Sequence, residues 1–554
     1  MNVFNKKITL GLIIGSREIF NGTLALQARR DITAQLDKLG LGYHILPVGE
    51  TQNGSVETPE DVRKYVQLFD EQRKDIDGFV VLLPNFGDEI AVVETIHRSR
   101  LNVPVLVQAC NDEINKVDLR GRRDAFCGKL SVCNNLYQYG IPFSDTTTHT
   151  CDIAGDEFAA DLDRFARVCR TVKGLKNARI GSIGARTSAF QTVRYSEKIL
   201  QASGLTVVTV DLSEILGAAT AIHDEAPEVK AQLEAIAAYG RIPAHIKREN
   251  ILKQAKLTLA VNRWIEKNEC DASAIQCWTS LQDNYGCASC LSMSMMSERL
   301  MPSACEVDVV GAVSMYTLAL ASGAPPALLD WNNNFGKEAN KCVCTHCGNF
   351  PKSFLGVEPE ISNLDVLGTT IGAEKCFGAV KGKVAAGPMT YFRASTDDLA
   401  GQVKAYLGEG RFTDDPFAMD GGIAVTELPR MRELLKHLCR NGFEHHVAMV
   451  RGNHAAVVDE AVSHYQKIRR ANSLEQALRL SGEFRVLCAA RESGAGSIAI
   501  NRYIADLLKK KSDTDFYQGR LCLVTENTAR EQLFNGDVGL CWPDEHGILR
   551  IWVE

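Results

Sequence analysis

The chain has 554 residues, of which 45% are hydrophobic and 23% are charged, and its formal net charge is -6. This length predicts three or four domains, and the composition is that of an ordinary globular protein. Acidic and basic residues are interspersed without a basic stripe or polybasic tract, which argues against nucleic-acid and membrane partners. No apolar segment approaches the roughly 20 residues needed to span a bilayer. The eighteen cysteines form no disulfide-rich pattern, which favours the reducing cytoplasm.

Strand and helix patterns alternate in the first part of the chain. Strands are predicted at 8–15, 43–49, 78–84 and 103–109, and helices at 23–39, 58–69 and 89–98. Thr58 and Asp61 have the spacing of a capping box. Strands separated by helices of 10–15 residues predict βαβ units and a parallel sheet.

A second alternating series of strands and helices follows, and the predicted secondary structure changes beyond residue 350. The second series has strands at 178–184, 205–211 and 273–278, with helices at 191–202 and about 226–268. The last part is rich in short, glycine-bounded strands, with helices expected near 396–407, 454–468 and 500–510. We therefore predict an α/β fold in which two doubly wound, flavodoxin/Rossmann-like parallel-sheet domains (1–173 and 174–350) precede a β-rich α+β domain (351–554).

Residues that could bind a metal follow predicted strands or open a helix in the segment 276–350. Glu306 opens an amphipathic helix expected from Val307, Asp330 follows the apolar run 327–329, and His346 follows another short run. Side chains delivered in this way converge on one crevice, as metal-assisted proton chemistry requires. The two carboxylates also have simpler readings, because Glu306 suits a helix start and Asp330 suits a cap or turn.

Three other features leave alternatives open. Cys287 and Cys290, with Cys342, Cys344 and Cys347, offer ligands for a structural zinc ion, although buried thiols that pack the core fit the spacing better. The segment GSIGARTS (181–188) and the later Asp211 resemble only part of a dinucleotide-binding fingerprint. His445 and His446 are adjacent, and in a strand only one of them faces a given site.

Taken together, these segments resemble the L-fucose isomerase/L-arabinose isomerase family. The stretch PSACEVDVVGAVSM…ASGAPPALLDW is similar to the segment with the two metal-binding carboxylates, which correspond to Glu306 and Asp330. GFEHHVAMVRGNH resembles the segment with the histidine ligand, which corresponds to His446. His346 stands at a spacing similar to an extra histidine ligand of arabinose isomerases, so it is either a ligand or lies behind the ligands.

The resemblance also implies a substrate site and an assembly. IIGSR resembles a strand-end motif whose arginine, here Arg17, contacts substrate from a neighbouring subunit, and the loop with Asn85 and Phe86 is of the same kind. It therefore implies a homo-oligomer, a hexamer or a trimer-based assembly. Gln276 and Trp278, at a predicted strand end, either line the sugar pocket or belong to the core.

Metal-dependent interconversion of an aldose and its ketose, through a cis-enediolate, is the function that these residues predict. Glu306 and Asp330 would act as metal ligands and as acid and base, and mixed oxygen and imidazole ligands favour Mn²⁺. The expected substrate is a sugar of the L-fucose, L-arabinose or D-arabinose type. The alternatives are an anionic hexose such as sulfoquinovose, for which Arg17 and Arg186 would be cationic partners, and a non-catalytic sugar-binding protein. A zinc-dependent or NAD-dependent enzyme is the third reading.

Overall fold

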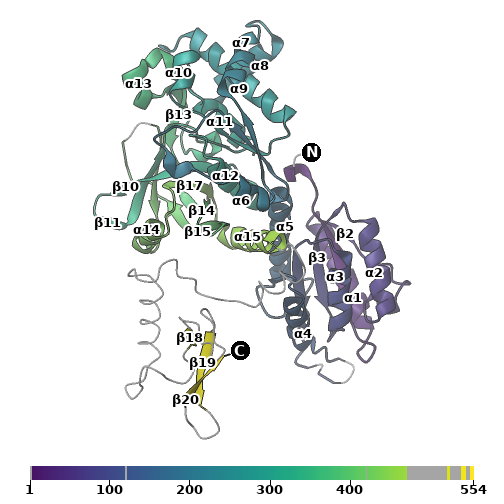
Figure 1. Ribbon diagram of the computed structural model, residues 1–554. Helices are drawn as coiled ribbons and strands as arrows, with labels where there is room; N and C mark the ends of the chain where they lie inside the picture. Colours follow the sequence, from purple (N-terminus) through teal and green to yellow (C-terminus); the bar gives the residue numbers. More distant parts are fainter. Residues whose placement is uncertain are drawn as a thin grey trace. The chain divides into compact units, whose positions relative to one another are not determined.

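The computed structural model describes residues 3–115, 117–118, 121–418, 421–470, 521–523, 538–543 and 549–553. The chain divides into two compact units, Met1–Ser481 and Gly482–Glu554. In the second unit, β18 (Leu521–Leu523), β19 (Val538–Pro543) and β20 (Leu549–Val553) form an antiparallel sheet (Figure 1). The helix predicted at 500–510 lies outside the described residues. No described helix has the length and apolar character to cross a membrane.

The first sheet of the large unit is parallel, as predicted, and has the strand order β2-β1-β3-β4-β5. Its central strands are buried along their whole length, since helices cover a parallel sheet on both faces. Thr58 and Asp61 form the expected capping box at the start of α2. The elements are β1 (Thr9–Ile14), α1 (Thr23–Lys38), β2 (Gly42–His44), α2 (Pro59–Glu71), β3 (Ile76–Leu83), α3 (Glu89–Ser99), β4 (Val105–Ala109), α4 (Ala125–Gln138) and β5 (Ser144–Asp145).

After α5 (Asp156–Leu175), a second parallel sheet has the order β7-β6-β8-β9. The helix predicted over 226–268 is in fact two helices, because Gly240 is fully extended and Pro243 cannot continue a helix. The helix predicted over 191–202 is a short turn, Gln191–Val193, followed by α6 (Glu197–Ala202). The other elements are β6 (Arg179–Ile183), β7 (Thr206–Val210), α7 (Leu212–Ala221), α8 (Pro227–Tyr239), α9 (Arg248–Lys267), β8 (Ala272–Ile275), α10 (Ser280–Asn284), α11 (Cys290–Glu298) and β9 (Ser303–Ala304).

The third sheet of this unit has eight strands in the order β11-β10-β17-β14-β15-β16-β13-β12, and a further pairing between β11 and β16 closes six of them into a ring. The helix predicted at 396–407 is wrong, because β14 and β15 form a long hairpin there, and the alternation in QVKAYL is that of a strand. The helix predicted at 454–468 is confirmed as α15 (Ala455–Arg470). The other elements are β10 (Ala327–Phe335), β11 (Glu338–His346), β12 (Glu360–Asn363), α13 (Asp365–Ile371), β13 (Phe377–Lys383), β14 (Gly387–Asp397), β15 (Gln402–Phe412), β16 (Gly422–Glu427), α14 (Met431–Arg440) and β17 (His446–Arg451).

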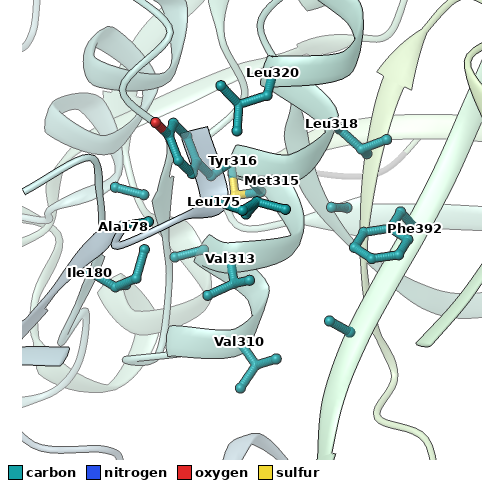
Figure 2. Close-up of a cluster of buried hydrophobic side chains, with 14 of the residues drawn as sticks. Leu175, Ala178, Ile180, Val310, Val313, Met315, Tyr316, Leu318, Leu320 and Phe392 are labelled. Atoms are coloured by element: carbon teal, nitrogen blue, oxygen red, sulfur yellow. The ribbon is translucent and has the colours of Figure 1, made fainter. Parts of the chain in front are cut away.

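Helix α12 (Val309–Ser322) is buried along nearly its whole length, from Val309 to Ala321. Figure 2 shows the side chains of α12 between two groups of apolar residues. Leu175, Ala178 and Ile180, from the end of α5 to the start of β6, lie on one side, and Phe392 of β14 lies on the other. The helix was predicted to be amphipathic, but a helix that packs against two sheets has no exposed face. Its rigid setting fixes the position of the residues that precede it. The two parallel α/β sheets and the β-rich sheet together confirm the predicted fold class.

Candidate metal centre

The structure brings Glu306, Asp330, His346 and His446 together, and we call these four residues the carboxylate–histidine cluster. Glu306 lies between β9 and α12, Asp330 is in β10, His346 ends β11 and His446 begins β17. Asp330 and His446 are directly paired across neighbouring antiparallel strands, so their side chains leave the same face of the sheet. Asp330 and His346 belong to the eight-stranded sheet, whereas Glu306 follows a strand of the second parallel sheet.

The backbone at Glu306 differs from the predicted helix start. Glu306 and Val307 have φ values of 55° and 57°, the left-handed region that is rare for a residue such as valine. Asp308 then caps α12, because its carboxylate accepts a hydrogen bond from the backbone N–H of Gly311 at 2.8 Å. The helix therefore begins at Val309 and not at Val307, and Glu306 lies in a turn before it. Such uncommon backbone conformations recur at functional sites, where the surrounding fold holds them in place.

The polar atoms of the cluster point at one another. His446 Nε2 lies 3.1 Å from Asp330 Oδ1 and 3.4 Å from Glu306 Oε2, and His346 Nε2 lies 3.5 Å from the same Glu306 oxygen. Glu306, His346 and His446 are each less than 5% exposed. Yet Glu306 Oε2, Asp330 Oδ1 and His346 Nε2 have no hydrogen-bond partner among the described residues. Buried polar atoms normally have partners, so this arrangement fits a divalent cation held by oxygen and imidazole ligands.

A second layer of charge lies behind His446. Asp308 Oδ2 is 2.8 Å from His446 Nδ1, and the Arg393 guanidinium binds both oxygens of Asp308. Arg393 also contacts Glu444, 3.4 Å away, and Glu444 accepts a hydrogen bond from Ser395 at 2.6 Å. Arg393 and Asp308 are completely buried. A carboxylate that holds the second nitrogen of a histidine orients the ring toward a metal.

These contacts shift the acidities of the site. Burial alone would raise the pKa of Glu306 and Asp330, but the neighbouring imidazoles outweigh it and keep both below their ordinary values. The pKa of Asp308 lies well below its usual range, because Arg393 and His446 overcome the effect of burial. Burial would lower the pKa of His446, but Asp308 and Asp330 raise it to about 9. The carboxylates are thus ionised near neutral pH and ready to bind a cation.

Aromatic residues cover the cluster on one side. The ring of Phe190 stacks on His446, with 6.3 Å between centroids, and meets Trp278 edge to face at 5.1 Å. Gln276 directly follows β8, and its side-chain oxygen accepts a hydrogen bond from the backbone N–H of Ala185 in the loop that leads to Phe190. Trp278 is thus linked to the cluster through Phe190, whereas Gln276 holds the covering loop.

Arg17, Asn85 and Phe86 gather elsewhere, at the carboxyl ends of β1 and β3. The Arg17 guanidinium lies 4.4 Å above the Phe86 ring and pairs with Glu89. Asn85 is fully buried and donates to the Ser16 hydroxyl at 2.9 Å. Within the described part of the chain, none of the recorded hydrogen bonds, ion pairs or ring contacts connects these residues to the carboxylate–histidine cluster.

The structure also places the residues of the alternative readings. His445 has a side chain that is 42% exposed and lies 3.6 Å from Asp330, outside the centre of the cluster. Asp211 caps α7 by accepting from the N–H of Ser213, a role that accounts for it without a nucleotide. Its pKa is lowered by that hydrogen bonding.

The cysteines are arranged differently from the zinc site considered for the sequence. Cys290 contacts Cys305, which also contacts Cys277, behind Glu306. Cys344 contacts Thr426 instead. Among the described residues, the groups spaced to hold a metal do not combine Cys287 with the cysteines at 342–347. Burial raises the pKa of the Cys277 thiol to about 12, so this thiol is neutral and packs in the core.

Three residues of the site were absent from the prediction: Asp308, Arg393 and Phe190. The sequence carried a signal for Arg393, because a lone arginine in the apolar strand MTYFRAS needs a buried partner. Asp308 stands two residues after Glu306, but an acid before a helix is too common to indicate more than a cap. Phe190 carried no signal, since its role depends on how a loop folds back.

Comparisons with known proteins identify relatives of this chain among sugar isomerases. A family model for the fucose/sulfoquinovose isomerase N-terminal domain matches residues 11–176, and one for the L-fucose isomerase C-terminal domain matches residues 344–471. The chain is 27% identical over 412 residues to the sulfoquinovose isomerase of Alkalicoccus urumqiensis, covering 73% of this chain and 86% of that protein. The sulfoquinovose isomerases of Priestia aryabhattai and Priestia megaterium are each 26% identical over 362 residues, covering 63% of this chain and 76% of theirs.

The two matched domains lie on either side of the segment that contains Glu306 and Asp330, and the second one contains His346 and His446. The order of the matched domains, the fold and the predicted residues agree with one another. The chain is therefore a divergent member of the L-fucose isomerase-like family.

Proposed function

We propose that this protein is a metal-dependent aldose–ketose isomerase in which Glu306 and Asp330 bind the metal and transfer protons. The observation that carries the proposal is the convergence of the Glu306 and Asp330 carboxylates on His446 Nε2, where Glu306 Oε2 and Asp330 Oδ1 are buried atoms that lack hydrogen-bond partners among the described residues. Isomerase activity agrees with the matched family domains and with the named relatives. The metal and the substrate are parts of the proposal.

The residues divide the chemistry between them. When bound, a divalent cation would neutralise the negative charge that develops on the sugar's O1 and O2. Glu306 and Asp330 are ionised, so a free oxygen of one can take the proton from C2 while the other moves the hydroxyl proton. Because Phe190 and Trp278 cover one side of the cluster, they limit the access of water to the carbanion-like intermediate.

Manganese is the metal that we propose. Glu306 and Asp330 supply oxygen ligands and His446 supplies one imidazole nitrogen, a mixture typical of Mn²⁺ rather than of a soft-metal site. The charges agree, because two ionised carboxylates face the site, while the charge of Asp308 is offset by Arg393. A divalent cation therefore brings the centre of the site close to neutrality.

We propose a sulfonated hexose of the sulfoquinovose type as the first substrate to test, because all the relatives named above are sulfoquinovose isomerases. Arg186 and Arg194 line a cavity of about 810 Å³ that also borders Val307, the neighbour of Glu306. The acids Asp397 and Glu444 line the same cavity, so its charge alone does not select an anionic sugar. Neutral sugars of the L-fucose, L-arabinose and D-arabinose types remain the competing class.

The experiment is isomerisation in D₂O. Protein stripped of metal and then loaded with Mn²⁺ is incubated with each of the four sugars, and proton NMR follows the loss of the C2 proton and the appearance of the ketose. We expect exchange with one class of sugar and only in the loaded protein. Tight sugar binding without any exchange would favour the non-catalytic sugar-binding protein instead.

Two substitutions assign the roles. Glu306→Gln and Asp330→Asn should each lower turnover by several orders of magnitude, with circular dichroism unchanged. Glu338→Gln is the matched control, because Glu338 is an exposed acid at the start of β11. Near-normal turnover in either purified site variant would contradict the assignment.

The remaining parts of the proposal concern the assembly and the compartment. We propose a homo-oligomer, a hexamer or a trimer-based assembly, in which Arg17 and Phe86 act on the substrate of a neighbouring subunit. Arg17→Ala should then raise KM even though Arg17 has no recorded contact with the cluster of its own chain. Sedimentation measures the assembly. The free cysteines of the described residues agree with a cytoplasmic enzyme.

A further inference from the structure

His346 and His446 approach the same oxygen of Glu306 in nearly the same way. Their Nε2 atoms lie 3.5 Å and 3.4 Å from Glu306 Oε2, and both rings are buried. Distance and burial therefore do not tell which of them binds a metal. Their other ring nitrogens do, because a neutral imidazole carries one proton, and the partner of Nδ1 decides which nitrogen holds it.

In His446, Nδ1 faces an acceptor. Asp308 Oδ2 lies 2.8 Å away and, as an ionised carboxylate, can only accept a hydrogen bond. Arg393 and the backbone N–H of Gly311 hold the same carboxylate in place, so it cannot turn away. The proton of a neutral His446 is therefore on Nδ1. The lone pair is on Nε2, which points toward Glu306 and Asp330.

In His346, Nδ1 faces a donor. The backbone N–H of Cys347 donates to it at 2.9 Å, and a backbone amide cannot act as an acceptor through its nitrogen. The lone pair of a neutral His346 is therefore on Nδ1, and its proton is on Nε2. That Nε2 atom is buried, has no hydrogen-bond partner within the described part of the chain and points toward Glu306.

Taking His446 as the imidazole ligand of the proposed metal site, we infer that His346 is not a second ligand but a hydrogen-bond donor to an oxygen of that site. The inference rests on the proposed metal site and deepens it, because it assigns opposite protonated nitrogens to two similarly placed rings. An Nε2 that carries a proton has no lone pair for a metal, but it can donate to Glu306 or to a sugar hydroxyl. His346 thus restrains Glu306 or the sugar without occupying a coordination position.

Pulsed electron paramagnetic resonance of the Mn²⁺-loaded protein tests this inference, because it counts the histidine nitrogens coupled to the metal. We expect one coupled imidazole in the natural protein. His346→Gln, which keeps a side-chain N–H donor, should leave that coupling and the Mn²⁺ stoichiometry unchanged. His446→Gln should abolish the coupling and lower the Mn²⁺ affinity at least tenfold. His445→Gln is the matched control, since His445 is adjacent and half-exposed, and should leave the spectrum unchanged.

Kinetics distinguish a donor from a residue that merely fills space. His346→Ala should raise KM or lower kcat at least tenfold, and His346→Gln should recover most of that loss because it restores a donor. Two coupled imidazoles, or loss of Mn²⁺ from a folded His346→Gln protein, would overturn the inference alone. A natural protein that binds no Mn²⁺ yet isomerises sugar would overturn the proposed metal dependence instead, and the assignment of His446 with it.

Discussion

Asp308→Asn is the most informative single change, because every hydrogen bond of the Asp308 carboxylate requires it to accept. Its Oδ2 accepts from His446 and Arg393, and its Oδ1 accepts from the N–H of Gly311 and from Arg393. Asparagine has one acceptor oxygen and one NH₂ group. In either orientation of the amide, the NH₂ group would therefore face two donors in a site without water access.

The expected losses of folding free energy and of Mn²⁺ affinity follow from the acceptor that Asp308→Asn removes. Removing one partner of a buried ion pair costs about 3–5 kcal/mol of folding free energy, and here the loss leaves Arg393 beside Glu444 alone. Losing the residue that orients a metal-binding histidine lowers metal affinity by about 10–100-fold. We therefore expect both a less stable protein and weaker Mn²⁺ binding, although Asp308 itself does not point at the metal position.

Urea unfolding of metal-free protein and Mn²⁺ titration measure the two effects separately. Arg411→Lys is the control, because Arg411 also pairs with a carboxylate but is largely exposed, and its stability should change by less than about 0.5 kcal/mol. An Asp308→Asn protein with the stability and Mn²⁺ affinity of the natural protein would refute the reasoning. It would mean that the Asp308–His446 contact neither orients the ring nor supports the fold.

Three other changes test the same site. The pKa of His446 is raised to about 9, so the imidazole of the folded metal-free protein stays protonated through neutral pH and Mn²⁺ must displace its proton. The apparent Mn²⁺ affinity should therefore rise about tenfold per pH unit up to pH 9 and then level off. Titration calorimetry in buffers of different ionisation enthalpy should show about one proton released per bound Mn²⁺. Gly311→Ala places a methyl group against Asp308 Oδ2 and should cost about 1–3 kcal/mol together with some Mn²⁺ affinity; an unchanged melting temperature would contradict the packing. Phe190→Ala uncovers His446 and Trp278 and should raise KM several-fold at constant Mn²⁺ content, so an unchanged KM would exclude Phe190 from the substrate site.

The sequence predicted those parts of the fold that depend on local pattern. Both parallel sheets and the helix after residue 454 follow from hydrophobic periodicity and capping. The helix predicted at 396–407 failed because charged residues at the hairpin masked a two-residue alternation. Glu306 was placed at a helix start because the sequence cannot show that two residues without glycine's freedom take the left-handed conformation.

Only those residues of the candidate site that lie in recognisable sequence motifs could be predicted. Glu306, Asp330, His346 and His446 were named from segments of the chain, and the structure gathers all four. The buried pair of Asp308 and Arg393 joins positions 85 residues apart, and no local pattern specifies such a contact. The protonated nitrogen of each histidine depends on one atom beside its ring, so it could not be assigned before the fold was known.

The pairing of Asp330 with His446 ties the chemistry to the register of two strands that are far apart in the sequence. A slip of one residue between β10 and β17 would turn the side chains of one strand to the opposite face of the sheet. Such a slip would separate Asp330 from His446, although the displaced strands could re-form a similar number of backbone hydrogen bonds with new partners. The proposed metal would therefore act as a check on assembly, because only chains with the correct strand alignment would gain the additional stability of a bound ion. Refolding in the presence of Mn²⁺ should accordingly enrich correctly aligned sheets at the expense of slipped ones.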